Sequence, residues 1–201
     1  MSALPPSVVL LRHGETMWNR ERRRQGQLDS ALTADGTRQA EAAASVCLRL
    51  GVDRIFTSPL GRARETALIL SSTLTLPVEE VDDLAEVHHG AFAGLTNDEI
   101  ALRYPGALDV REREKYTWAF PGGESYADAA VRASRAIDRV AATGAASPLL
   151  VTHEMIGRML MRSLLELSVE EALVLPIPHG TVLEVNPVQR RATSHDASPP
   201  T

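Results

Sequence analysis

Short runs of aliphatic residues, each followed at once by polar residues, are the clearest pattern in the chain. Residues 8–11 are four aliphatic residues in succession, and residues 149–152 form a second apolar run. Such runs are typical of strands that are buried on both faces of a sheet. Residues 54–58, 77–81 and 180–185 are further candidate strands. The pattern therefore predicts several short strands separated by longer segments.

Helical periodicity occupies most of the segments between these strands. After Thr33, a typical N-cap residue, apolar residues recur at helical spacing up to Gly51. The residues of this stripe are Ala40, Ala43, Ala44, Cys47, Leu48 and Leu50. Further helices are predicted at residues 59–73, 96–104, 125–142, 155–165 and 168–171. The alternation of strands and helices predicts an α/β fold, with three α/β/α layers around a mainly parallel central sheet.

The same pattern predicts the organisation of the chain. Residues 1–186 are expected to form a single domain, in which residues 86–123 interrupt the alternation and form a small inserted cap segment. Residues 17–30 lack an apolar period and are expected to form a loop, and the alternating charges of residues 109–115 predict an exposed segment. Residues 187–201 are rich in Pro, Ser and Arg and are expected to be disordered.

Composition excludes several classes of protein. The chain has 201 residues, of which 44% are hydrophobic, and this is enough for a substantial core. A net charge of -5 argues against a general nucleic-acid surface, and a single cysteine, Cys47, excludes an intrachain disulfide and a cysteine-based zinc site. The N-terminal apolar run is interrupted by Arg12 and is too short to span a membrane. We expect a cytoplasmic protein that binds neither nucleic acid nor membrane, and we leave open whether it forms a homodimer.

Two of the predicted strands end in histidine, and this is the main chemical signal. His13 follows Arg12 at the end of the first strand, His153 ends the second apolar run, and Arg62 falls in the first turn of the helix after residues 54–58. If these strands are parallel neighbours, their carboxyl ends bring both imidazoles and both guanidiniums to one phosphate-sized space. A neutral imidazole can attack phosphorus and form phosphohistidine. Arg12 or His13 alone could equally belong to a strand that simply exits into solvent.

Together with three further motifs, the motifs that contain His13, Arg62 and His153 resemble the histidine phosphatase superfamily, the phosphoglycerate-mutase-like proteins. The matching residues are 11–16 with Asn19; 25–26, 29 and 32–33; 57–63 with 66–67; Glu86 with Gly90 and Gly94; 121–125; and 151–153. One such motif is a weak signal, whereas six in order over residues 8–185 are specific. The resemblance implies chemistry on a small phosphorylated metabolite without a metal or another cofactor.

The resemblance also implies roles for the residues at matching positions. His13 would be the nucleophile that accepts the phosphoryl group. Arg12, Arg62 and His153 would bind its oxygens and stabilise the developing charge. Glu86 would protonate the leaving oxygen and later take a proton from water. Additional substrate-binding candidates are Asn19, Gln25, Gly26, Glu154 and His88.

The main departure from the family pattern is Glu154, which stands where the family usually has glycine after the second histidine. A carboxylate aimed at the phosphate would repel it, so the side chain is expected to point away or to pair with a cation such as Arg158. His88 and His89 lie next to the segment that contains Glu86. Either one of them lines the substrate pocket, or both are solvated. The basic run at residues 22–24 would either steer anions or form a solvated loop.

Three functions fit this sequence. The first is a metal-independent phosphomonoesterase of the histidine acid phosphatase type. The second is a cofactor-dependent phosphoglycerate mutase, which would return the phosphoryl group to its substrate. The third, a catalytically silent phosphate-binding module, is the least favoured because every catalytic position is filled. The cations between Gly94 and Pro121 are interspersed with acidic residues, so no clean anion-binding patch is evident, and this favours the phosphatase.

Overall fold

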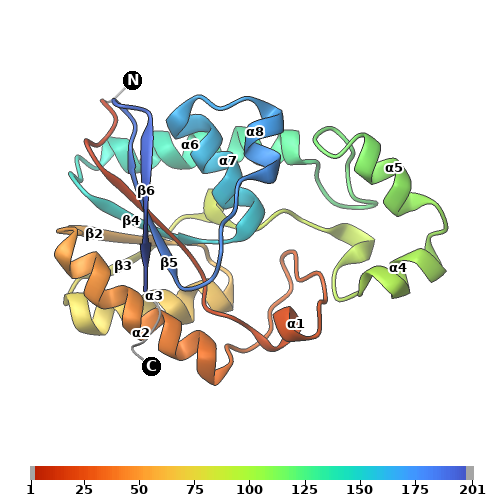
Figure 1. Cartoon of the computed structure of the whole chain (residues 1–201), viewed down its shortest axis with the longest axis horizontal. Helices are drawn as coiled ribbons and strands as arrows, with labels where there is room; N and C mark the ends of the chain where they lie inside the picture. Colours follow the sequence, from red (N-terminus) through yellow and green to blue (C-terminus); the bar gives the residue numbers. More distant parts are fainter. Residues whose placement is uncertain (1–2, 198–201) are drawn as a thin grey trace.

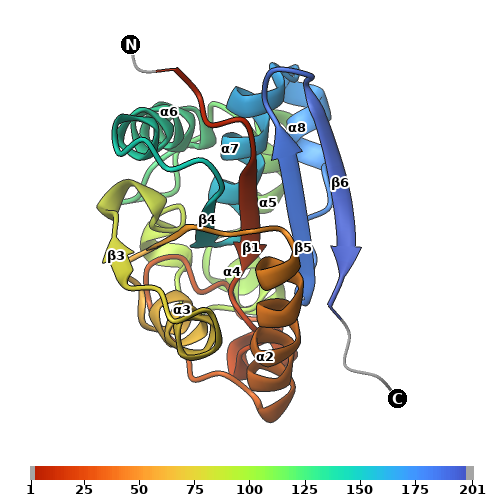
Figure 2. The same cartoon turned by 90° about the vertical axis from the view of Figure 1, so that its left-hand side faces the viewer.

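A six-stranded sheet forms the centre of the computed structural model, which describes residues 3–197 (Figures 1 and 2). The strands are β1 (Val8–Arg12), β2 (Arg54–Thr57), β3 (Val78–Glu80), β4 (Pro148–Thr152), β5 (Thr181–Asn186) and β6 (Arg191–Asp196), in the spatial order β3-β2-β4-β1-β5-β6. Strands β1 to β4 are parallel, whereas β5 is antiparallel to β1 and β6 to β5. The predicted α/β fold with a mainly parallel sheet is confirmed, and so is the adjacency of the two apolar strands β1 and β4.

Helices cover both faces of this sheet. They are α1 (Met17–Arg20), α2 (Ala34–Arg49), α3 (Gly61–Leu74), α4 (Asn97–Arg103), α5 (Ala107–Arg113), α6 (Tyr126–Ala142), α7 (Glu154–Leu165) and α8 (Val169–Val174), with 3-10 turns η1 (Asp82–Leu84) and η2 (Gly90–Phe92). In Figure 1, α6 and α7 lie above the sheet and α2 and α3 lie below it. Most of the predicted stripe of α2 faces the sheet, although Leu48 is 62% exposed. No helix in residues 3–197 is long and apolar enough to cross a membrane.

The alternating side chains of β1 connect the two halves of the core. Val8 and Leu10 pack into the cluster that includes α6 and α7, whereas Val9 and Leu11 pack into the cluster of α2 and α3. This follows from the two-residue period of a strand, because every residue of β1 up to Leu11 is buried on one face or the other. The strand is therefore rigidly held, and so is the turn that follows it.

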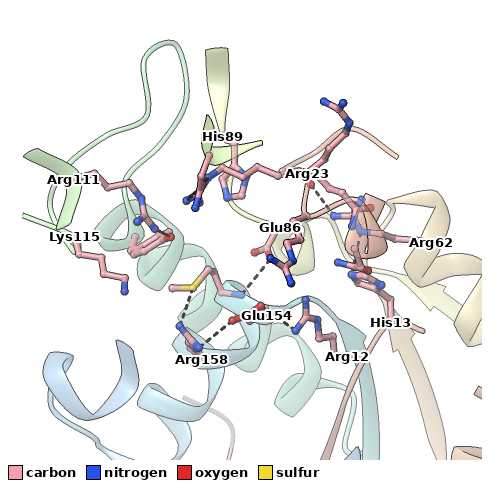
Figure 3. A pocket seen from close by; sticks show the side chains of 18 residues that line it. Arg12, His13, Arg23, Arg62, Glu86, His89, Arg111, Lys115, Glu154 and Arg158 are labelled. Atoms are coloured by element: carbon pink, nitrogen blue, oxygen red, sulfur yellow. Dashed lines mark hydrogen bonds and ion pairs between the residues drawn. The ribbon is translucent and has the colours of Figure 1, made fainter. Parts of the chain in front are cut away.

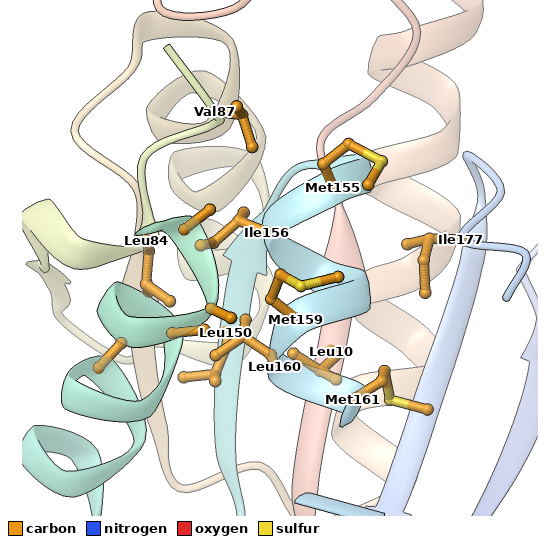
Figure 4. Close-up of a cluster of buried hydrophobic side chains, with 14 of the residues drawn as sticks. Leu10, Leu84, Val87, Leu150, Met155, Ile156, Met159, Leu160, Met161 and Ile177 are labelled. Atoms are coloured by element: carbon orange, nitrogen blue, oxygen red, sulfur yellow. The ribbon is translucent and has the colours of Figure 1, made fainter. Parts of the chain in front are cut away.

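Helix α7 is fixed against the sheet by a continuous apolar stripe. Ile156, Met159 and Leu160 of this helix pack with Leu10 and Leu150 of the sheet, and all five are at most 2% exposed (Figure 4). Burial of each such side chain stabilises the fold by roughly 1.5–3 kcal/mol. This packing places the first turn of α7 beside the carboxyl ends of β1 and β4.

Two segments that were expected to be irregular contain short helices. Residues 17–30 begin with α1, where Thr16 and Asn19 form a capping box. Residues 109–115, expected to be exposed, lie mostly in α5, and Arg111 of this helix is only 7% exposed. The guanidinium of Arg111 lies over the rings of Phe120 and Tyr126, 5.5 Å from each centroid, so its burial is offset by aromatic contacts.

The expected disorder of residues 187–201 is wrong as far as Ala197. Residues 191–196 form β6, which pairs with β5 along its whole length, and Ala197 is buried at 3% exposure in the cluster of α2 and α3. The strand is polar because it is an edge strand with little burial on either face, so its sequence shows no apolar alternation. Residues 198–201 lie outside the described residues.

Candidate active site

The carboxyl ends of β1 and β4 bring the two predicted histidines together. The amide N–H of His13 donates to the carbonyl of Thr152 at 2.9 Å, and the rings of His13 and His153 lie 5.1 Å apart. Both side chains are almost fully buried, at 3% and 0% exposure. The turn after His13 is tight, because a Cβ on Gly14 would lie 2.3 Å from the carbonyl oxygen of Gly36. Glycine is therefore required where β1 passes α2.

The hydrogen bonds of His13 define its tautomer. Its Nδ1 donates to the carbonyl oxygen of Gly14 at 2.8 Å, which leaves the Nε2 lone pair to accept from Nε of Arg62 at 3.2 Å. The backbone carbonyl of His13 in turn accepts from Nδ1 of His179 at 2.7 Å. Burial, followed by the charges of Arg62 and Arg12, lowers the pKa of His13 well below its ordinary value. The ring is therefore neutral at neutral pH, with its unprotonated lone pair on Nε2.

Arg62 connects His13 to the loop after α1. Its side chain is 1% exposed and donates to the carbonyls of Gly26 and Leu28, both at 2.7 Å, and to Oδ1 of Asp29 at 3.0 Å. These bonds fix the planar guanidinium with its Nε edge toward His13. The same bonds place Gly26 and its neighbour Gln25 in the wall of the cavity.

The guanidinium of Arg12 is oriented by two acceptors, the carbonyl of Ile177 and the carboxylate of Glu154. Its Nη1 donates to the carbonyl of Ile177 at 3.1 Å and pairs with Oε2 of Glu154 at 2.9 Å, while its buried Nε has no partner among residues 3–197. A buried donor without a partner is costly, so this edge of the guanidinium is suited to an anion. Arg12 and Arg62 thus both line the cavity that contains His13.

His153, like Arg12, has a buried nitrogen without a hydrogen-bond partner among residues 3–197. Its Nε2 lies 2.8 Å from Oγ of Ser58, whose oxygen also accepts from the amide of Leu60, and Nδ1 is buried without a partner among the described residues. Burial and the charge of Arg62 lower the pKa of His153 well below its ordinary value, so the ring is neutral. If the hydroxyl of Ser58 donates to Nε2, the proton of His153 lies on Nδ1, where it can be donated to a phosphate oxygen. Ser58 belongs to the matched motif at residues 57–63, but the sequence alone predicts no individual role for it.

Glu86 is held at the first turn of α7. One carboxylate oxygen accepts from the amides of Val87 at 2.9 Å and Ile156 at 3.2 Å, and the other accepts from the amide of Met155 at 3.2 Å. Its side chain lines the cavity and lies centrally among the labelled side chains in Figure 3. A carboxyl group in this position can exchange a proton with an ester oxygen bound near His13.

Glu154 pairs with cations, which is one of the two outcomes expected for this unusual residue. Its carboxylate bridges Nη1 of Arg12 at 2.9 Å and Nη2 of Arg158 at 3.0 Å. Arg158 is itself anchored to the carbonyls of Leu173 and Leu175, both at 2.8 Å. The negative charge of Glu154 is therefore balanced within the wall of the cavity.

The remaining predicted binding residues divide into those that line the cavity and one that does not. Asn19, which accepts from Thr16 through Oδ1, lines the cavity of about 510 Å³ together with Gln25 and Gly26. His88 is exposed and lies outside this lining, whereas His89 is 8% exposed and belongs to it. Of the two adjacent histidines, His89 therefore lines the cavity, and the binding candidate His88 does not. Among residues 3–197, no group of three or more His, Cys, Asp or Glu side chains is arranged to hold a metal ion.

The fold and the site define an α/β protein with two histidines and two arginines gathered at the carboxyl edge of its sheet. The family model described as the histidine phosphatase superfamily (branch 1) matches residues 8–196, and the chain belongs to this superfamily. The resemblance of the sequence motifs to this family is therefore confirmed.

Relatives within this superfamily are phosphatases. Glucosyl-3-phosphoglycerate phosphatase of Mycobacterium tuberculosis is 39% identical over 171 residues, which cover 81% of this chain and 76% of the relative. The uncharacterized phosphatase PhoE of Bacillus subtilis is 36% identical and covers 73% of this chain and 76% of its own length. A solved structure of mycobacterial glucosyl-3-phosphoglycerate phosphatase with VO3 has a TM-score of 0.81 at 34% identity and covers 90% of both chains.

Other curated relatives are much longer than this chain. The bifunctional protein Rv2228c of Mycobacterium tuberculosis is 38% identical over 81% of this chain, but the match spans only 45% of the relative. The chain thus corresponds to less than half of the length of that protein.

Proposed function

We propose that the protein hydrolyses a small phosphomonoester through a phosphohistidine intermediate at His13. The observation that supports this most directly is the tautomer of His13, whose Nδ1 proton is held by Gly14 while the Nε2 lone pair lies beside Arg62. A buried, neutral imidazole whose Nε2 carries an unprotonated lone pair is suited to attack on phosphorus. The phosphatase names of the relatives support the same reaction.

The reaction takes two displacements. In the first, Nε2 of His13 forms a bond to phosphorus as the ester P–O bond breaks, and the carboxylic acid form of Glu86 protonates the departing oxygen. In the second, the Glu86 carboxylate takes a proton from water, the water oxygen bonds to phosphorus, and the N–P bond breaks to release inorganic phosphate. Arg12, Arg62 and Nδ1 of His153 would stabilise the charge on the phosphoryl oxygens throughout.

A cofactor-dependent phosphoglycerate mutase is the second candidate, and one observation favours it. The cations of the inserted segment are mixed with acids in the sequence, but Arg111 and Lys115 both line the cavity whereas Asp109, Glu112 and Glu114 do not. The mixture of charges in the sequence is therefore not reproduced in the lining of the cavity. A mutase needs such cations to hold a carboxylate-bearing substrate, whereas the phosphatase reaction also needs access for water.

A coupled assay separates these functions. The protein is incubated with 2- or 3-phosphoglycerate, with and without the bisphosphorylated primer, and with a panel of phosphorylated metabolites. We expect release of inorganic phosphate with little interconversion of the phosphoglycerates. Interconversion far faster than phosphate release would show the mutase, and stoichiometric phosphate binding without turnover would show the silent module.

A further inference from the structure

The cavity carries more positive charge than one phosphate needs. Its lining includes eight cationic side chains and two carboxylates, Glu86 and Glu154. The cationic side chains are Arg12, Arg22, Arg23, Arg24, Arg62, Arg111, Lys115 and Arg158. Glu154 neutralises part of this charge on the wall that carries Arg12 and Arg158. The excess therefore lies elsewhere in the cavity.

Figure 3 shows where the excess lies. Arg111, Lys115 and His89 occupy the side of the cavity away from His13 and Arg62, with Glu86 between the two groups. These three residues come from the inserted segment, so they approach the cavity from a different element than the phosphate-binding strands. A ligand that filled the cavity would contact both groups.

The cations on this side have weak internal partners. Arg24 donates to Oδ1 of Asn97 at 2.9 and 3.2 Å and has no ion pair within residues 3–197. Arg111 donates through Nη2 to the hydroxyl of Tyr126, while its buried Nε has no partner in that range. Among residues 3–197, the one carboxylate that forms an ion pair with Arg111 or Lys115 is Glu112, 3.8 Å from each of them, and its side chain is 70% exposed. Water therefore screens that carboxylate.

Arg24 and Arg111 also repel each other. Burial is the first cause that lowers the pKa of the Arg24 guanidinium, and the charge of Arg111 is the second. Two half-buried or buried cations that line the same cavity repel each other until an anion enters. The protein thus retains an unfavourable pair where an anion would be stabilised by both.

His89 is an independent indication of a ligand. It is only 8% exposed and lines the cavity, yet neither of its ring nitrogens has a hydrogen-bond partner in residues 3–197. Buried polar groups are nearly always satisfied, so this ring is expected to bond to a bound molecule. The ring is neutral because burial, followed by the charges of Arg24 and Arg111, lowers its pKa to about 3. One of its nitrogens therefore carries an N–H that can be donated.

We propose that Arg24, Arg111 and His89, with Lys115 beside them, bind a second anionic group of the substrate, a carboxylate or a second phosphate. This proposal rests on the proposed phosphatase function. If the phosphate of the substrate binds at His13, the remaining part of the same substrate extends toward Arg24, Arg111 and His89. The carboxylate of Glu154 would repel a second anionic group from the side of the cavity that carries Arg12 and Arg158. A doubly anionic substrate therefore has one favourable orientation, with its second anionic group toward Arg111.

Matched synthetic substrates test this proposal. Alkyl phosphates that end in a carboxylate are compared with plain alkyl phosphates of the same carbon count, over a series of increasing linker length. Alkanediol bisphosphates form a parallel series that distinguishes a second phosphate from a carboxylate. At the best linker length we expect kcat/KM for the doubly anionic ester to exceed that of the plain ester by about tenfold or more, the effect of one or two charge-assisted hydrogen bonds.

Variants locate the effect. In Arg24→Gln and Lys115→Gln we expect the ratio between the matched substrates to fall by roughly tenfold toward one, since each variant removes one cation. Taking the ratio within each variant cancels any general loss of activity. Arg113→Gln is the matched control, because Arg113 lies on the same segment, is exposed and does not line the cavity, so it should keep the wild-type ratio.

The outcomes also separate this proposal from the proposed function. Hydrolysis of plain esters with no preference at any linker length would overturn the second subsite and leave the phosphatase intact. If no ester is hydrolysed, the phosphatase proposal is wrong, and calorimetric binding of the same matched compounds then tests the subsite. Preferential binding of doubly anionic compounds that is lost in Arg24→Gln but kept in Arg113→Gln would support it, and equal binding would overturn it.

Discussion

The neutral state of buried His89 predicts a specific dependence of stability on pH. The pKa of His89 is lowered from 6.5 to about 3 in the folded protein, mainly by burial. As pH falls below about 6.5, the unfolded chain binds a proton at this residue whereas the folded protein does not. Above about pH 6.5, the free energy of unfolding therefore does not depend on the titration of His89. As the pH falls from about 6.5 to about 3, protonation of His89 in the unfolded chain progressively lowers the free energy of unfolding.

The magnitude follows from the two pKa values. Between about pH 7.5 and pH 4.5, protonation of the unfolded state at His89 should remove about 2.7 kcal/mol of folding free energy, since each pH unit below 6.5 is about 1.36 kcal/mol. The perturbation is His89→Gln, which abolishes this titration and leaves the other histidines in place. The free energy of unfolding is measured by urea denaturation at both pH values, in buffers without phosphate or other anionic ligands.

The measured quantity is the stability of wild type minus that of His89→Gln, and its change between the two pH values. A decrease of about 2–3 kcal/mol on acidification is expected. His88→Gln is the matched control, because it removes the adjacent, solvent-exposed imidazole, which does not line the cavity. If the difference in free energy of unfolding between wild type and His89→Gln does not change with pH, the conclusion that His89 is buried and neutral is refuted.

Three further predictions concern the phosphoryl site. Glu86→Gln should slow hydrolysis of alkyl phosphates by roughly 10²–10⁴-fold but that of p-nitrophenyl phosphate by much less, because a good leaving group needs little protonation; equal losses would assign the acid to another residue. Ser58→Ala should release the tautomer of His153 and lower kcat/KM about tenfold without unfolding the protein, whereas Ser58→Thr should retain more activity. Activity should survive excess chelator, because Arg12, Arg62 and two histidines carry out the charge stabilisation; a loss restored by Mg²⁺ or Zn²⁺ would contradict this mechanism.

The parts of the fold that the sequence predicted are those with strong local patterns. Leu10 and Leu150 lie in uninterrupted aliphatic runs, which are typical of central strands that are buried on both faces. Strands β1 and β4, and the histidines that follow them, could therefore be predicted. The N-caps Thr33 and Ser125 likewise mark the starts of α2 and α6. The convergence of Arg12, His13, Arg62 and His153 follows once those strands are parallel neighbours.

The parts that were missed depend on tertiary contacts. Strand β6 has polar residues on both faces, so only its pairing with β5 shows that it is a strand. Arg111 is buried because Phe120 and Tyr126 lie against its guanidinium, and the local sequence of alternating charges gives no sign of this. His88 and His89 are adjacent, and their opposite exposure depends on the ring of Phe120, which lies 4.5 Å from that of His89.

The central claim, that His13 carries the phosphoryl group, is tested most directly by trapping the phosphoenzyme. Wild-type protein is mixed with labelled substrate, quenched rapidly without acid, digested and analysed by mass spectrometry. We predict an acid-labile phosphoryl group on Nε2 of His13, absent from His13→Ala, whose folded state is checked by circular dichroism. A label that persists in folded His13→Ala, or that is found on another residue, would contradict the account.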